Sequence, residues 1–290
     1  MKALVFGSMN IDCVYQQDHI VCPGETLSSL SFARNAGGKG LNQAIALAKA
    51  GMETWFAGNI GEDGLFLKAL LEQNGIRTDM IRIGETPTGC AIIQVDKNGQ
   101  NAIVLYGGAN QTVTEEQIRE TLANFGPGDL LLMQNEINLG RELLAAARAA
   151  GITVAVNPSP ISPELTRWPL ETADWLILNE IEGAALGTEG TPVVMYEALE
   201  KKYPDTRIVL TLGEDGSMAR DGDHLVRQAS VRVPVVDTTA AGDTFTGFFL
   251  HAVMNGTDIT SALNRAARAA AITVSRPGAG ASIPTRDEVD

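Results

Sequence analysis

Short apolar segments alternate with helix-like segments through the C-terminal two-thirds of the chain, and this alternation limits the possible folds more than any other feature. Strands are expected at 130–134, 152–157, 175–178 and 208–212, and helices at 140–150 and from 180 to 186. Strands that are apolar throughout and separated by helices indicate a parallel sheet covered on both faces. Such sheets bind ligands at the carboxyl ends of their strands.

Two segments interrupt the alternation. Residues 13–35 are polar and interrupted by Pro23-Gly24, whereas residues 89–106 have the pattern of a hairpin with a turn at Asn98-Gly99. We predict that these segments pair into a small sheet projecting from the main one, a candidate lid formed by about 13–36 and 87–107. An ordinary meander at the edge of the main sheet is the alternative.

Composition and charge exclude several classes of protein. The formal net charge of -13 argues against general binding to nucleic acid or to an anionic membrane, so any anionic ligand must be held locally. The three cysteines, Cys13, Cys22 and Cys90, form no CxxC pair, which argues against a disulfide framework or a zinc site. No stretch has the length of a membrane span and the N-terminus does not resemble a signal peptide. We therefore expect a cytoplasmic protein.

The segment 237–249, DTTAAGDTFTGFF, combines acids, a turn of small residues and the start of an apolar helix expected at 245–254. Ala240, Ala241 and Gly242 allow a ligand to approach the backbone closely. The N-terminus of a helix suits an anion such as a phosphate group. Asp243 beside it either handles a proton or simply caps the helix.

Polar residues also follow the expected N-terminal strand at 4–6. Asn10 and Asp12 are two residues apart, so in an extended chain they share a side, where an amide and a carboxylate suit hydroxyl groups. A glycine loop at 36–40 precedes an expected helix at 43–50, and Lys39 and Asn42 lie within one turn of each other. This loop is not a Walker A motif. A tight turn with a solvated lysine is the alternative.

Further polar clusters follow the later strands. Glu136 is an acid at a strand end, and Asn179 and Glu182 share a helix face that can hold a hydrated cation. Charges that complement the helix dipole are the alternative for Glu182. A glycine-bounded turn lies at 211–216, and a loop at 276–282 offers carbonyl groups and a hydroxyl.

The order of these motifs resembles the PfkB family of carbohydrate kinases over essentially the whole chain, with AGGKGLNQA and DTTAAGDTFTGFF matching its two signatures. The resemblance implies one α/β domain spanning residues 1–290. Its fold would be a three-layer sandwich with a central, mainly parallel sheet and a small β-sheet lid. Family members often dimerise through this lid, so we expect a homodimer.

The resemblance also implies roles for individual residues. Asp243 would be the general base, and Ala240, Ala241 and Gly242 would form an anion hole for the transferred phosphate. The implied sugar-binding residues are Asn10, Asp12, Gly38, Lys39, Asn42 and Glu136. The implied nucleotide-binding residues are Asn179, Thr211, Gly213 and Gly216. Asn179 and Glu182 would hold Mg²⁺ through water, and the implied K⁺ site comprises Asp237, Thr239, Thr273, Arg276, Gly278 and Ser282.

Within the family the chain is most similar to enzymes that phosphorylate ribose. This implies ATP-dependent conversion of D-ribose to D-ribose 5-phosphate, with Mg²⁺ and K⁺ as cofactors and with neither nucleic acid nor membrane as a partner. Another sugar, such as deoxyribose or a ketohexose, or a nucleoside remains the alternative substrate. The polar set favours a small sugar, because a nucleoside base would need an apolar shelf. A non-catalytic sugar-binding regulator is the alternative from another class.

Overall fold

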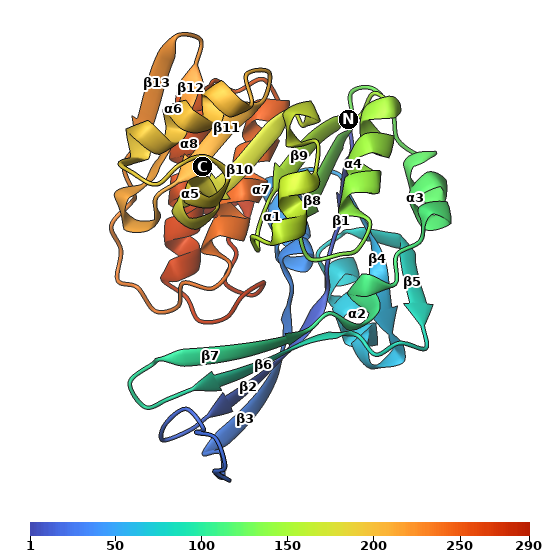
Figure 1. Cartoon of the computed structure of the whole chain (residues 1–290), viewed down its shortest axis with the longest axis vertical. Helices are drawn as coiled ribbons and strands as arrows, with labels where there is room; N and C mark the ends of the chain where they lie inside the picture. The colour runs from blue at the N-terminus through green and yellow to red at the C-terminus, as the bar shows by residue number, and fades with distance from the viewer.

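A large sheet with helices on both faces forms the body of the molecule, and a smaller sheet projects from it (Figure 1). The computed structural model describes all residues, 1–290. The large sheet has nine strands in the order β13-β12-β11-β10-β9-β8-β1-β4-β5. Their bounds are Ala3–Phe6 (β1), Thr54–Gly61 (β4), Arg77–Gly84 (β5), Leu130–Gln134 (β8), Thr153–Asn157 (β9), Trp175–Asn179 (β10), Arg207–Thr211 (β11), Ser217–Asp221 (β12) and His224–Gln228 (β13).

Seven of these strands pair in parallel, and at one edge β12 pairs antiparallel with both β11 and β13. The expected strands at 130–134, 152–157, 175–178 and 208–212 are confirmed to within one residue as β8 to β11. They are predictable because helices cover both faces of the sheet, which leaves nearly every position in these strands buried.

Successive residues of a strand belong to two different hydrophobic cores, one on each face of the large sheet. In β8, Leu130 and Leu132 belong to the core under α1, α2, α7 and α8, whereas Leu131 and Met133 belong to the core under α3 to α6. The expected three-layer sandwich is therefore confirmed. The helices are α1 (Lys39–Ala50), α2 (Leu65–Gln73), α3 (Glu115–Leu122), α4 (Gly140–Ala149), α5 (Glu180–Leu186), α6 (Pro192–Lys202), α7 (Ala241–Met254), α8 (Ile259–Val274) and the short C-terminal α9 (Arg286–Val289).

The small sheet joins the two segments that interrupt the alternation. Its order is β3-β2-β6-β7, with bounds Asn10–Gln16 (β2), Ser31–Gly37 (β3), Gly89–Val95 (β6) and Asn101–Tyr106 (β7). The predicted hairpin is β6 and β7, and Gly99 in its turn has a φ of 78°. Figure 1 shows this sheet extending away from the body, so an edge meander is excluded.

Two helices begin earlier than expected. Helix α1 starts at Lys39 and not at residue 43, because Gly40 lies against the backbone of Ser8, where a Cβ would be 2.5 Å from the amide nitrogen. Helix α7 starts at Ala241 and not at residue 245, since Ala240 adopts the left-handed conformation and turns the chain directly into the helix. Lys39 and the anion-hole residues thus lie on or beside first helical turns. None of the helices combines the length and apolar character that crossing a membrane requires.

Candidate active site

Asp243 lies in the first turn of α7, two residues after the helix begins. The N-cap position belongs to Ala240, and no side chain caps this helix. The interpretation of Asp243 as a helix cap is therefore wrong. Its buried carboxylate accepts hydrogen bonds from two amides of α1, with Nδ2 of Asn42 at 3.1 Å from Oδ2 and Nε2 of Gln43 at 2.9 Å from Oδ1.

The backbone around Asp243 offers free donors. The first N–H of α7 with a helical partner is that of Thr244, which donates to the Ala240 carbonyl at 2.8 Å. Of the predicted anion-hole residues, Gly242 has an N–H without an acceptor within the protein, as has Asp243, whereas the Ala241 N–H donates to the Thr238 carbonyl at 3.3 Å. Two free amides at the positive end of a helix form a site that attracts an anion.

A polar cavity of about 240 Å³ opens in front of this turn. It gathers residues from the carboxyl ends of β9, β10 and β11 and from the first turns of α1, α5 and α7. Its lining residues are Lys39, Asn157, Ser159, Ile177, Leu178, Asn179, Glu182, Thr211, Thr238, Ala240, Ala241, Gly242, Asp243 and Thr246.

Asn42 has an unpaired acceptor atom, and Glu136 has a carboxylate whose orientation is fixed by hydrogen bonds. The Oδ1 atom of Asn42 is buried and has no hydrogen-bond partner, so it can accept a hydrogen bond from a bound hydroxyl. The Glu136 carboxylate accepts hydrogen bonds from the Ser8 hydroxyl and from the Lys39 backbone N–H, the latter at 3.0 Å. Its orientation is thereby fixed by the glycine loop.

Asn10 and Asp12 lie on β2, where the small sheet leaves the body. Nδ2 of buried Asn110 donates to Oδ1 of Asn10 at 2.7 Å and to the Met9 carbonyl at 3.2 Å. Because Oδ1 of Asn10 is occupied in this way, its Nδ2 is left to donate to a ligand. Burial, and then the nearby Glu136 carboxylate, raise the pKa of Asp12 to about 6. The pair thus offers one donor and one acceptor to hydroxyl groups.

Close packing of the glycine loop determines the shape of this region. Gly38 has a φ of 97°, and a Cβ there would lie 3.0 Å from the backbone of both Asn10 and Ser8. A Cβ on Gly37 would collide with the Asp12 carboxylate. Gly38 is therefore restricted to glycine by its backbone conformation and its close contacts, and the loop brings the first turn of α1 against the start of β2.

Asn179 and Glu182 form a reciprocal cap at the start of α5. The Asn179 side chain accepts from the N–H groups of Ile181 and Glu182, and Oε2 of Glu182 accepts from the Asn179 N–H at 2.8 Å. Both residues also line the polar cavity, and Glu182 is almost completely buried. Because Oε1 of Glu182 takes no part in the cap, one carboxylate oxygen remains for a ligand.

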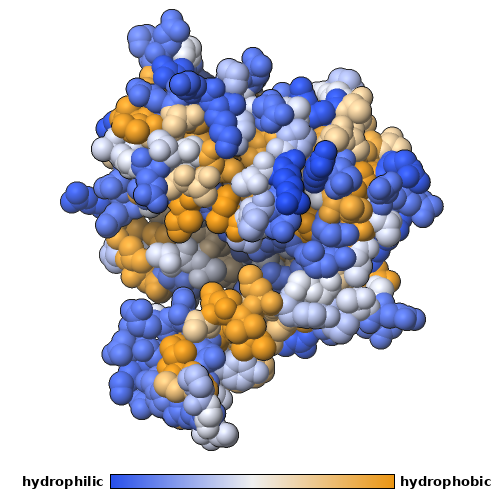
Figure 2. Space-filling model, viewed as in Figure 1, coloured by the Kyte–Doolittle hydropathy of each residue, from blue (hydrophilic) through white to orange (hydrophobic).

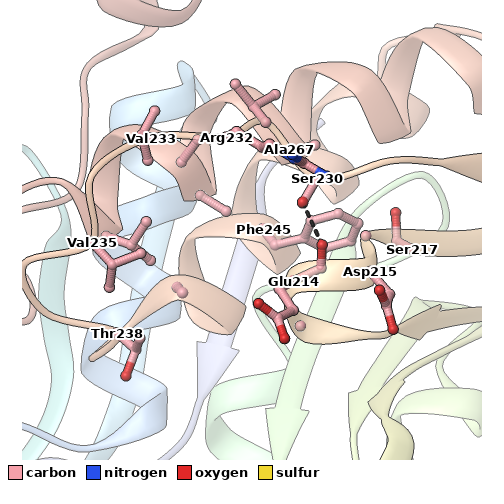
Figure 3. A pocket seen from close by; sticks show the side chains of 17 residues that line it. Glu214, Asp215, Ser217, Ser230, Arg232, Val233, Val235, Thr238, Phe245 and Ala267 are labelled. Atoms are coloured by element: carbon pink, nitrogen blue, oxygen red, sulfur yellow. Dashed lines mark hydrogen bonds between the residues drawn. The ribbon is translucent and has the colours of Figure 1, made fainter.

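A larger cavity of about 620 Å³ lies on the other side of the Thr238–Ala241 turn (Figure 3). Gly213 and Gly216, two of the residues expected to bind the nucleotide, line this cavity, whereas Thr211 lines the polar cavity because it ends β11 before the chain turns. The wall opposite the glycine turn is apolar and comes from α7, α8 and the segment after β13. Its residues include Val231, Val233, Val235, Phe245, Ala267, Ala270, Ala271 and Val274.

The expected K⁺ ligands come from the segment before α7, from the end of α8 at Thr273 and from the loop after α8. The first and the last of these are joined by Asp237. Its Oδ1 accepts from the hydroxyl and the N–H of Thr239 at 2.7 and 2.9 Å, and its Oδ2 accepts from the Gly278 N–H at 3.0 Å. Burial raises the pKa of Asp237, but these hydrogen bonds outweigh it and hold the pKa below its usual value. The Arg276 side chain is paired with Glu288 at 2.6 Å, so Arg276 can offer a cation only its carbonyl group.

The hydroxyls of the remaining two residues of that set are also engaged. Thr273 is buried and its hydroxyl donates to the Ala269 carbonyl at 3.2 Å, and the Ser282 hydroxyl donates to the Ala279 carbonyl at 2.7 Å. Because each hydroxyl proton is donated to a carbonyl group, only the lone pairs of these two oxygens remain for a cation.

Several residues of the site were missed from the sequence, and four of them orient or adjoin a predicted side chain. Ser8 and Asn110 orient Glu136 and Asn10, and Gln43 and Asn157 lie beside Asp243. Only Asn157 carried a usable signal, because it ends a strand directly before a proline, as Glu136 and Asn179 follow their own strands. The others lie within segments whose pattern was assigned to a strand, a loop or a helix.

A buried carboxylate, free amides at a helix start and an adjoining cavity large enough for a nucleotide define a kinase that acts on a small molecule. Comparison with known families agrees. Residues 1–286 match the pfkB family carbohydrate kinases, and the chain belongs to this family.

Curated relatives match along nearly the full length. The chain is 37% identical to a ribokinase of Haemophilus influenzae, covering 98% of this chain and 95% of the relative. It is 36% identical to a ribokinase of Bacillus subtilis, covering 99% and 97%. A solved structure of Arabidopsis thaliana ribokinase complexed with ribose and ATP superposes with a TM-score of 0.89 at 31% identity, covering 99% of this chain and 97% of that one.

The raised pKa of Asp12 predicts a pH dependence of stability. In the unfolded chain the carboxyl has its ordinary pKa of 3.8, so between pH 3.8 and about 6 the folded state retains a proton that the unfolded state has lost. The Asp12 contribution is therefore fully present below pH 3.8 and is lost as pH rises through about 6, by up to about 3 kcal/mol.

Urea denaturation of the wild type and of Asp12→Asn between pH 4 and 7 measures this contribution. We expect the free energy of unfolding of the wild type to fall with rising pH relative to that of the variant. Parallel pH curves for the two proteins would show that burial does not raise the pKa of Asp12.

Proposed function

We propose that this protein transfers the γ-phosphate of ATP to the primary hydroxyl of D-ribose. The observation that carries this proposal is the position of Asp243 between three adjoining compartments. The hydroxyl-binding cluster around Asp12 and Glu136 lies on one side, the polar cavity lies in front, and the larger cavity lies beyond the turn that contains Thr238 and Ala241. In our proposal the sugar, the transferred phosphate and the nucleoside occupy these three places in turn.

The relatives support ribose as the acceptor and ATP as the donor. The first relatives bear the name ribokinase, and the Arabidopsis thaliana structure contains ribose and ATP. The polar character of the cluster agrees with a sugar. Asn10 and Asp12 offer a donor and an acceptor, and the unpaired Oδ1 of Asn42 offers another acceptor.

In the proposed reaction the Asp243 carboxylate accepts the proton of the primary hydroxyl. The hydroxyl oxygen then forms a bond to the γ-phosphorus, and the bond from that phosphorus to the β–γ bridging oxygen breaks, leaving ADP. The free N–H groups of Gly242 and Asp243 stabilise the charge on the transferred group. Because the amides of Asn42 and Gln43 hold Asp243, the carboxylate needs little rearrangement to take the proton.

The polar cavity fits a hydrated Mg²⁺. Hard cations prefer oxygen ligands, and the free Oε1 of Glu182 is a buried carboxylate oxygen in that cavity. Asn179 holds the Glu182 side chain in place through the reciprocal cap. When bound, Mg²⁺ would neutralise charge on the phosphate groups of ATP.

The loops joined by Asp237 fit a K⁺ ion. Asp237 is hydrogen-bonded both to Thr239, just before α7, and to Gly278, so its carboxylate lies where these two segments meet. A cation held there would stiffen the turn that precedes Asp243. We therefore propose that K⁺ activates the enzyme.

The small sheet would act as a lid and as a dimer surface. Figure 2 shows that the molecule is hollowed between the body and the small sheet, and Asn10 and Asp12 lie on β2 of this sheet. Closure of the sheet over this hollow would exclude water from the transfer. The register places Phe32, Ile92, Val104 and Tyr106 on the face opposite Asp12, and all four are exposed. Exposed apolar surface of this kind marks an interaction site.

A panel of acceptors tests the proposed activity. ADP formation is measured with ribose, 2-deoxyribose, fructose and adenosine, in K⁺ or Na⁺ buffer and with Mg²⁺ present or chelated. We expect the highest kcat/KM with ribose, stimulation by K⁺ and no turnover without Mg²⁺. If ribose binds in calorimetry but no acceptor yields ADP, the protein is a sugar-binding regulator and the proposal is wrong.

The oligomeric state tests the dimer. Val104 is 61% exposed, and Val104→Asp places a charge within the apolar face. We expect the wild type to sediment as a dimer and Val104→Asp as a monomer, whereas Val194→Asp on α6, where the valine is 48% exposed, stays dimeric. A monomeric wild type would contradict the role of the small sheet in assembly.

A further inference from the structure

Gln43 is a completely buried amide in the second turn of α1, directly after Asn42. Its Nε2 donates to Oδ1 of Asp243 at 2.9 Å and to Oδ1 of Asn157 at 3.2 Å. Its Oε1 accepts from Nε2 of Gln134 at 2.6 Å. Both sides of the amide are therefore occupied, by residues from α7 and from the ends of β9 and β8.

The orientation of this amide follows from its neighbours. A carboxylate can only accept, and so can a backbone carbonyl. Nδ2 of Asn157 donates to the Ile177 carbonyl at 2.7 Å, which leaves Oδ1 of Asn157 facing Gln43 as an acceptor. The amide nitrogen of Gln43 thus lies between two acceptors, and the flipped amide would turn its oxygen toward both of them.

We infer that Gln43 is a positioning residue for Asp243: it fixes one carboxylate oxygen and ties it to the strand ends through Asn157 and Gln134. The inference rests on the proposed function, in which Asp243 takes the proton. The two carboxylate oxygens then have different tasks. Oδ1 is anchored to the protein interior through Gln43, and Oδ2 contacts Asn42, whose free Oδ1 is available to the sugar.

The position of Gln43 predicts that its loss lowers the turnover rate without weakening the binding of either substrate. Gln43 lies behind Asp243 and does not line either cavity, so its loss leaves the contacts to the sugar and to the nucleotide in place. An unanchored carboxylate can rotate away from the reacting hydroxyl. A misplacement of about 1 Å at a reacting group can lower the rate by about 100-fold.

The test compares Gln43→Met, which has the same length but no donor, with Gln43→Glu, which places a carboxylate beside Asp243. We expect kcat to fall by about 10- to 100-fold in both variants, while the KM for ribose and for ATP stays unchanged. Either variant suffices if the other does not fold. Wild-type kcat in a folded variant, or a fall in kcat matched by weaker binding of both substrates, would overturn the inference.

Gln117→Met is the matched control. Gln117 is another buried glutamine on a helix, and its Nε2 donates to Oδ1 of Asn59 at 2.7 Å, away from both cavities. It should lose thermal stability as Gln43→Met does but retain kcat. A comparable fall in kcat in Gln117→Met would assign Gln43 a merely structural effect.

The Asp243→Asn background separates the inference from the proposed function. If Gln43 acts through Asp243, Gln43→Met should cause no further loss of the residual rate in that background. An additional loss equal to that in the wild type would overturn the inference. If Asp243→Asn itself keeps wild-type kcat, the proposed function is wrong; if it is inactive and Gln43→Met is fully active, only the inference about Gln43 is wrong.

Discussion

The close contact between α1 and α7 is the constraint on which the rest of the site depends. Gly247, one turn after Asp243, lies so near α1 that a Cβ there would be 2.5 Å from Cβ of Ala46 and 2.8 Å from the Leu47 nitrogen. Only glycine permits this approach. It brings the starts of two helices together, one carrying Asn42 and Gln43 and the other carrying Asp243, so that a carboxylate from one helix meets amides from the other.

The parallel sheet supplies the remaining partners. Its strands end along one edge, and residues far apart in the chain meet there: Glu136 after β8, Asn157 at the end of β9 and Asn179 at the end of β10. The small sheet brings Asp12 to the same place through β2. Charge is then held locally by buried carboxylates and helix amides, which reconciles a strongly acidic chain with a phosphate-bearing substrate.

Much of this could be predicted from the sequence, because some patterns have a single physical cause. Strands buried on both faces are apolar throughout, so β8 to β11 were found almost to the residue, and the Asn98-Gly99 turn revealed the hairpin. The start of α1 was missed because Gly40 disfavours a helix locally, and only the contact with Ser8 explains it. Gln43 could not be singled out, since its partners come from α7, β8 and β9 and no local pattern records them.

The central claim is that Asp243 receives the proton of the sugar hydroxyl while the start of α7 holds the transferred phosphate. A crystal structure of the protein with ribose and a non-hydrolysable ATP analogue tests it most directly. We predict that the primary hydroxyl oxygen lies within hydrogen-bonding distance of the Asp243 carboxylate and that the γ-phosphate contacts the N–H of Gly242. A primary hydroxyl directed away from Asp243, or a γ-phosphate remote from the start of α7, would contradict the account.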